Sequence, residues 1–431
     1  MKTASASKSV LVKKIIGSDI RPMMDRLTAA PALHRKAVLW GLIFFFASWF
    51  VLQTVPFIHE WDTDSPSYYT AAHGLRKNIN IYDDQELQPL GDILFGKSFV
   101  VYPYIYPPLL AQLCLPLSYL PPSTYFLMIY VVNILLVFLG LFLMFDLLGL
   151  GDGRSLLPAL VPFFLLPFNE PLLTTIHHGQ INLLVFDAIL LFLVLPKKGK
   201  PVLAAFFLSL AVFLKIYPIL FILPLLVQKR LRSLAAFAAG SVGLLAASLL
   251  ISGPAPWLDF MKSTIALFFK KPDSPFTRGF QNSFGNVSLK GFLTQAFSRF
   301  HLPESAVVPV FLLLVAFLLV WIFSISRKKA FNSDLARESS IFFILTLLLA
   351  PITWSHHFVI MLMPVAYLAG RTISEKKYPA FILLAFLTSQ IFYQLPWGAF
   401  PFNQVRFFAT LGFLAMLLHF AKKSPRELHA S

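Results

Sequence analysis

The sequence predicts an all-α polytopic membrane protein. Of its 431 residues, 57% are hydrophobic and only 13% are charged, and the mean hydropathy is +0.72. A soluble domain typically carries about a quarter charged residues. Uncharged apolar runs occupy residues 38–58, 123–145, 305–326 and 378–405. Because a helix needs roughly 20 apolar residues to cross the hydrocarbon layer, these runs predict membrane-spanning helices.

The positions of the basic residues predict the orientation. The net charge of +16 fits cytoplasmic loops rich in Lys and Arg, as in other membrane proteins, rather than a nucleic-acid-binding surface. Basic clusters follow apolar runs at residues 197–200, 229–232, 327–329, 371–377 and 422–426. Placing these clusters and the basic N-terminus inside predicts about twelve helices in a cell (inner or plasma) membrane, with both termini cytoplasmic. They run near 38–58, 123–147, 155–169, 180–196, 201–214, 216–228, 234–252, 305–326, 339–351, 355–370, 378–395 and 402–421.

One transmembrane domain, residues 38–421, is expected between a basic cytoplasmic N-terminus, 1–37, and a cytoplasmic tail, 422–431. Its two substantial external loops are 59–122 and 253–304. The first apolar run is too long for the core of a signal peptide and no small-residue cleavage site follows it, which indicates an uncleaved helix. Residues 201–228 are interpreted as two short helices with Lys215 at their outer turn, because a charge at mid-membrane costs several kcal/mol.

The first external loop opens with an acid-rich stretch, EWDTDSPSYYTAA, residues 60–72. Ser65 before Pro66 predicts a helix start, with Ser as the N-cap and Pro at the first helical position. Tyr68, Tyr69, Ala72 and Leu75 then recur every three or four residues, which predicts an amphipathic helix on the outer membrane surface. A second such helix is expected to begin at Pro108 and to stop or kink at Pro116.

Two acids of this stretch are candidate functional groups. Asp64 lies next to the predicted helix N-terminus, whose positive potential favours an ionised carboxylate, and such a group can accept a proton from a hydroxyl. Asp62 and Asp64 also form a D-x-D pattern that can hold a divalent cation. The competing interpretation is that both are solvated loop residues.

Other polar residues gather at the predicted outer ends of helices. The predicted donor- and acceptor-binding residues are Asp62, Tyr68, His177, His178, Gln180, Asn182, Lys215, Arg278, Asn282, His356, His357 and Arg406. Singly, such residues usually anchor a helix at the interface; together, with an acid-rich loop, they suit a reaction on a lipid-linked phosphate substrate. Asp187 lies within a predicted helix, where it either faces a cavity or pairs with a neighbour. The single cysteine, Cys114, excludes an internal disulfide and a cysteine-rich zinc site.

The order of several short motifs resembles that of a known family. The stretches are "DSPSYYTAA", "NIY", "YPPLLAQLCLPLSYLP", "GQINLL", "LAVFLKIYPILFILPLLVQKR" and "PITWSHH". In this order, over about 300 residues, the chain resembles the integral-membrane glycosyltransferases of the GT-C superfamily and, within them, glycosyltransferase family 87. That family includes mannosyltransferases that use polyprenyl-phosphate-mannose.

The resemblance implies a GT-C fold and an inverting hexosyltransferase with Asp64 as the catalytic residue. It implies a polyprenyl-phosphate-sugar donor, a glycolipid or glycan acceptor, and no cofactor or required metal, which weakens the metal interpretation of Asp62 and Asp64. It also implies that Lys215 and the histidines of "SHH" lie near the donor phosphate, with the choice between His356 and His357 open. The family pattern Asn-Gln-Ser is here Gln281-Asn282-Ser283, which puts the role of Asn282 in doubt.

Two other functions compete with the transferase. Twelve helices with both ends inside is also a common layout of transporters and flippases, although no internal repeat is visible. The third alternative is a non-catalytic assembly partner. The expected partners are the lipid-linked donor, the acceptor and membrane lipids, with no nucleic acid.

Overall fold

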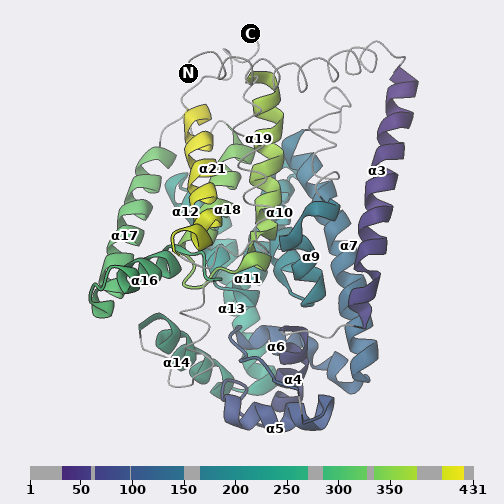
Figure 1. Ribbon diagram of the computed structural model, residues 1–431, viewed down its shortest axis with the longest axis vertical. Coiled ribbons are helices and arrows are strands. Elements are labelled where there is room, and N and C mark those ends of the chain that lie inside the picture. The colour runs from purple at the N-terminus through teal and green to yellow at the C-terminus, as the bar shows by residue number, and fades with distance from the viewer. Residues whose placement is uncertain are drawn as a thin grey trace, which may run out of the picture.

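The computed structural model describes residues 32–59, 64–97, 99–149, 166–269, 285–327, 334–375 and 400–421, and every regular element among them is a helix (Figure 1). The α-helices are α3 (Ala32–Thr54), α4 (Asp64–Arg76), α5 (Asp84–Phe95), α6 (Pro108–Cys114), α7 (Pro122–Leu148), α9 (Glu170–His177), α10 (Asn182–Val194), α11 (Pro201–Leu214), α12 (Ile222–Val227), α13 (Leu231–Ser252), α14 (Ala255–Phe269), α16 (Leu289–Arg299), α17 (Val307–Ser326), α18 (Leu335–Leu349), α19 (Leu362–Glu375) and α21 (Val405–Ala421). Short 3-10 helices are η1 (Val55–Ile58), η2 (Pro116–Tyr119), η4 (Leu166–Phe168), η5 (Leu195–Lys198), η6 (Tyr217–Phe221), η7 (Glu304–Ala306), η8 (Ser355–Met361) and η9 (Phe402–Gln404).

Several of these helices have the length and apolar composition that are typical of membrane-spanning helices. In the described part of the chain, four are long and apolar enough to span a bilayer: Trp40–Ile58, Pro122–Leu148, Leu231–Ser252 and Glu304–Ile325. Helices α9 and α10 form a pair bent by 117°, which makes a fifth if counted as one span.

The expected count of twelve spans is not confirmed. Most of the expected helix 155–169 and all of 378–395 lie outside the described residues. Helices do occur at the other ten positions, but several are short or broken. Helix α11, with 14 residues, is about 21 Å long, less than the roughly 30 Å of a hydrocarbon core.

The described part of the loop predicted at 59–122 forms a small helical layer at one end of the molecule, where α4, α5 and α6 lie near α14 (Figure 1). The expectation of an amphipathic surface helix at α4 was wrong. Its residues from Ser65 to Ala72 are all buried, on polar and apolar sides alike, because α5, α6 and α7 pack around it. The predicted cap was also wrong: α4 begins at Asp64, and the buried Ser65 Oγ has no hydrogen-bond partner among the described residues.

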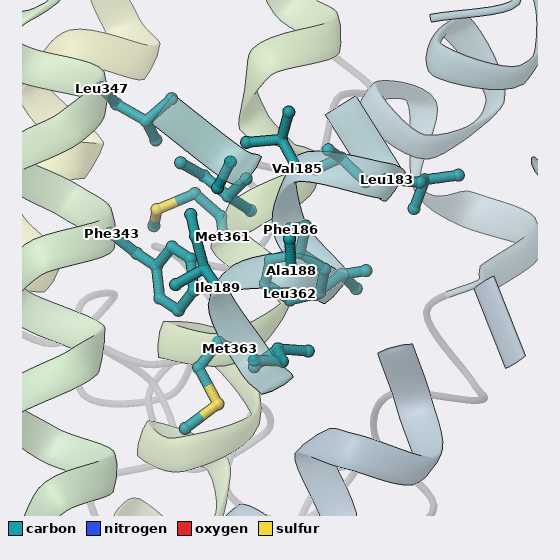
Figure 2. Close-up of a cluster of buried hydrophobic side chains, with 14 of the residues drawn as sticks. Leu183, Val185, Phe186, Ala188, Ile189, Phe343, Leu347, Met361, Leu362 and Met363 are labelled. Carbon is teal, nitrogen blue, oxygen red and sulfur yellow. The ribbon is translucent and has the colours of Figure 1, made fainter. Parts of the chain in front are cut away.

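Helix α10 forms the centre of the core. It packs against α7 and α11 and contacts η8, and its Leu183, Phe186 and Ile189 are almost fully buried. Figure 2 shows Phe186 and Ile189 near Phe343 of α18 and Met361 to Met363 at the η8–α19 junction, with Leu183 on the other side of α10. The apolar residues on all sides of α10 therefore hold its N-terminal end in place within the bundle.

Three helix breaks position polar groups next to one another. The chain bends between α9 and α10 at residues 178–181. It breaks at Lys215, whose extended backbone (φ −147°, ψ 133°) ends α11 before Pro218. It breaks again after α18, where Ala350 is extended, as expected for a residue that precedes a proline. The predicted division of 201–228 into two helices at Lys215 is confirmed.

Candidate active site

A cavity of about 290 Å³ lies where the first loop meets these breaks. Its polar lining includes Asp64, Tyr106, Lys215, His356 and His357, which come from distant parts of the sequence. Most of the remaining lining is apolar, with Ile216, Leu220, Val315, Leu349 and Ile352 among it. The cavity therefore combines a carboxylate, a cation and imidazole groups with an apolar wall.

Asp64 lies on this cavity at the first residue of α4, where the helix dipole favours negative charge. The Tyr106 hydroxyl donates to Asp64 Oδ1 over 3.0 Å. Burial, followed by the nearby charge of Asp64, raises the pKa of Tyr106 well above its usual value. Tyr106 therefore stays a neutral phenol, able to orient the carboxylate by donating a hydrogen bond.

Gln180 links the two sides of the site. Its Oε1 accepts from the Tyr68 hydroxyl at 3.0 Å and from Lys215 Nζ at 3.4 Å. It also lies 3.3 Å from the Tyr106 hydroxyl, whose one proton is donated to the closer Asp64 carboxylate. Its Nε2 lies 3.3 Å from His356 Nε2. At 1% exposure, the amide joins the Asp64 side of the cavity to the histidines.

Lys215 is the buried cation of the site, with 6% of its surface exposed. Its Nζ donates to Asn182 Oδ1 over 2.6 Å, and no carboxylate among the described residues forms an ion pair with it. Burial lowers the pKa of Lys215 to about 7, while the charge of Asp64 opposes the shift. The ammonium group would gain from an anion brought into the cavity.

The two histidines have different surroundings. The Trp354 backbone N–H donates to His357 Nδ1 over 3.0 Å, which leaves the ring proton of a neutral His357 on Nε2. That Nε2 lies 3.5 Å from Lys215 Nζ. His356 is held through its backbone oxygen, which accepts from Thr175 Oγ1 and Asn182 Nδ2. Lys215 and His357 thus present two N–H donors at nearly the same point.

Residues 286–287, within the loop predicted at 253–304, support this histidine segment. Asn286 Oδ1 accepts from Thr353 N over 3.0 Å and its Nδ2 donates to Pro351 O over 3.2 Å. Val287 N donates to Thr353 O over 2.9 Å. The amide of Asn286, 1% exposed, therefore fixes the turn that carries the histidines.

The remaining predicted residues lie elsewhere. Arg406 forms an ion pair with Glu170 at 2.9 Å and does not line the cavity. His177 packs on Phe57, with ring centroids 4.7 Å apart. His178 accepts from Ser65 N through its backbone oxygen at 3.0 Å, and its ring lies 5.8 Å from that of His356.

Three predicted residues, Asp62, Arg278 and Asn282, lie outside the described residues. Within the described ranges, no group of three or more His, Cys, Asp or Glu side chains could hold a metal ion. Asp187 is 1% exposed and faces Gly140 on α7, and neither of its carboxylate oxygens has a hydrogen-bond partner among the described residues.

Sequence reasoning missed Tyr106 and Glu170 as partners of the predicted groups. Tyr106 opens the "YPPLL" motif, and a tyrosine beside two prolines in an acid-rich loop was an available signal. No local signal indicates that Glu170 pairs with Arg406, because 236 positions separate them.

Comparison with known proteins identifies the family. No curated protein matches the chain. The profile of glycosyltransferase family 87 matches residues 104–351, more than half of the sequence. The matched range contains Tyr106, Gln180, Asn182 and Lys215. Asp64, His356 and His357 lie outside it. A match over more than half of the sequence shows that this chain belongs to glycosyltransferase family 87.

Proposed function

We propose that the protein is an inverting hexosyltransferase of the GT-C type. It moves a hexose, mannose in the first instance, from a polyprenyl-phosphate-sugar to a lipid or glycan acceptor on the outer face of the cell membrane. The observation that carries this proposal is the single cavity lined by Asp64, Lys215 and His357. These three groups supply a base for the acceptor and two donors for the departing phosphate.

The phosphate side of the reaction is assigned to Lys215 and His357. Their nitrogen atoms lie 3.5 Å apart, and with a proton on both neither can satisfy the other. A phosphate oxygen placed between them would accept from both. Such charge-assisted hydrogen bonds strengthen as negative charge develops on a leaving phosphate.

The acceptor side is assigned to Asp64. Its carboxylate takes the proton of the acceptor hydroxyl while that oxygen forms a bond to the anomeric carbon. The bond from that carbon to the phosphate oxygen breaks, and its electron pair leaves with the lipid phosphate. Because attack and departure occur on opposite faces of the sugar, the configuration inverts. Tyr106 orients the carboxylate through the bond to Oδ1.

The apolar wall suits the isoprenoid tail of the donor. Ile216 on this wall is 43% exposed and Ile219 is 39% exposed, so the wall continues onto the outer surface of the protein. Each buried methylene of a lipid chain contributes about 0.8 kcal/mol. The reactive sugar can therefore enter the cavity while its lipid stays in the bilayer.

The competing functions are weaker. Membership of a glycosyltransferase family disfavours a transporter or flippase. A non-catalytic assembly partner is the remaining alternative, and it predicts that Asp64 has no role in turnover.

Substitution of Asp64 tests the proposal. Purified Asp64→Asn protein, given synthetic polyprenyl-phosphate-mannose and acceptor-containing membrane extract, should transfer sugar roughly 10²–10⁴-fold more slowly than wild type. Asp259→Asn is the matched control, because Asp259 lies at the same end of the molecule and pairs with the exposed Lys262 outside the cavity lining. Near wild-type turnover by Asp64→Asn would refute the assignment of Asp64. In a separate experiment, replacing the donor by polyprenyl-phosphate-glucose or by a nucleotide sugar tests which donor the protein uses.

A further inference from the structure

A second cavity, of about 420 Å³, lies at the opposite ends of helices that shape the first. At the C-terminal end of α11, Lys215 lines the first cavity, and at its N-terminal end Pro201 and Ala204 line the second. Likewise, Leu349 at the end of α18 lines the first cavity and Glu338 near its start lines the second. The two cavities share no lining residue. Lys215 and Pro201 lie at opposite ends of α11, about 20 Å apart, although the two linings come close together at Leu220 and Phe221 of η6. The charged groups of the second cavity are therefore not part of the proposed transfer site.

A poorly compensated acid lies deep in this cavity. Glu338 is 3% exposed, and its one side-chain hydrogen bond within the described part of the chain is a long one, 3.5 Å from Gln228 Nε2. Burial raises the pKa of Glu338 to about 7, and the charges of Arg230 and Arg337 only partly oppose this. Glu338 lacks the close cationic donor that a buried carboxylate needs.

Two cations also line the cavity. Arg230, before the first turn of α13, is exposed, and its guanidinium group makes no hydrogen bond or ion pair with any described residue. Lys197 is exposed as well, and it donates to the Leu147 backbone oxygen over 3.2 Å. The cavity therefore has an acid inside and two cationic groups toward the solvent.

The remaining lining is apolar, and the cavity lies at a level typical of lipid headgroups. Phe192, Leu193, Leu225 and Phe342 contribute to the wall. Helices α10 and α11 end and begin beside the cavity at the basic cluster 197–200, and α13 begins beside it at the cluster 229–232; α18 begins beside it at Leu335. Basic residues at helix ends mark the headgroup region of a bilayer, and pockets among them bind lipid headgroups.

We propose that this cavity binds the phosphoethanolamine headgroup of a membrane phospholipid. The ammonium group of the headgroup donates to the Glu338 carboxylate, and its phosphate accepts from Arg230 and Lys197. The acyl chains lie along the apolar wall. A choline headgroup has no N–H to donate to Glu338, and a glycerol headgroup has no cation, so the arrangement selects a primary amine.

Lipid titration followed by native mass spectrometry of the full-length protein in detergent tests this proposal. Phosphatidylethanolamine, phosphatidylcholine and phosphatidylglycerol with identical acyl chains are the probes. Wild type should bind the ethanolamine lipid at least about tenfold more tightly than the other two, as expected for a hydrogen bond between charged groups. Glu338→Gln should lose this preference, and Arg230→Gln should weaken all three. Arg232→Gln is the matched control, because Arg232 is exposed near the same helix end and does not line the cavity.

Three results would overturn the proposal: equal binding of the three lipids by wild type, an unchanged preference in Glu338→Gln, or a preference for phosphatidylglycerol. If Glu338→Gln does not fold, Ser233→Trp replaces it, because Ser233 lines the cavity without carrying charge. This variant should lose the ethanolamine lipid, and retention of the lipid would contradict the site. Displacement of the lipid by an equal concentration of glycerophosphoethanolamine would show a water-soluble ligand and would overturn the lipid assignment.

Discussion

The turn at Gly179 allows a sharp test of how Asp64 is positioned. Gly179 has a positive φ of +59°, and a Cβ added there would lie 2.5 Å from Ser65 Cβ and 2.8 Å from Ser65 Oγ. Ser65 N also donates to His178 O over 3.0 Å. The first turn of α4, which carries Asp64, therefore rests directly on this glycine, and we predict that Gly179→Ala displaces the Asp64 carboxylate.

The expected magnitude follows from two separable effects. An alanine in the left-handed region costs about 1–2 kcal/mol, which affects stability. Carbon atoms in contact normally lie about 3.5–4.0 Å apart, so Ser65 and the adjacent Asp64 must move by about 1 Å. A misplacement of about 1 Å in a catalytic group can slow a reaction by about 10²-fold.

Gly199→Ala is the matched control. Gly199 has a similar φ of +72°, but no atom lies within 4 Å of a Cβ built there. Both variants should lose similar thermal stability, whereas only Gly179→Ala should lose turnover of the lipid-linked donor. Adding Ser65→Gly removes the side chain in closest contact and should restore part of the activity. Equal turnover in the two alanine variants would refute the reasoning.

Two further predictions concern the charged groups. Because burial lowers the pKa of Lys215 to about 7, and only its ammonium form binds phosphate, kcat/KM for the donor should fall as the pH rises above about 7. The fall in kcat should occur at higher pH, because the phosphate of the bound donor stabilises the ammonium form and so raises the pKa of Lys215 in the complex. Lys215→Arg should abolish the fall, and a flat wild-type profile from about pH 6 to 9 would contradict the role of Lys215. Arg406→Gln breaks the ion pair with Glu170, whose side chains are 11% and 24% exposed respectively, and should cost about 1–3 kcal/mol of stability while kcat is retained. A loss of turnover at unchanged melting temperature would instead place Arg406 in donor binding.

The long apolar helices could be predicted because their length and hydrophobicity are local properties. The run expected at 123–147 forms Pro122–Leu148, and 201–214 has the expected bounds because Pro201 starts the helix and Lys215 ends it. Helices α5, α14 and α16 were missed, since only the helices starting near Pro66 and Pro108 were predicted in loop 59–122 and none was predicted in loop 253–304. A cap was nevertheless visible in two of them: Asp83 caps α5 and Ser288 caps α16.

The misplacement of α4 has a physical reason in its composition. The tyrosine spacing indicated one apolar face, but the other faces carry Ser67, Thr70, Ala71 and Gly74. Small residues let neighbouring helices approach closely. A Cβ at Gly74 would lie 3.0 Å from Ile81 Cγ2. The small residues, rather than the tyrosines, were the signal that α4 would be buried on all sides.

The sequence could nominate polar residues at helix ends, but it could not decide which of them meet. Gln180 and Arg406 had similar standing as candidates, yet Gln180 contacts two tyrosines, Lys215 and His356, whereas Arg406 is paired with Glu170. Gln180 lies at the 117° bend between α9 and α10, where it is almost fully buried, whereas Glu170 lies at the other end of α9. A bend of this kind depends on tertiary packing around α10, so no pattern confined to one helix could have predicted the partners of either residue.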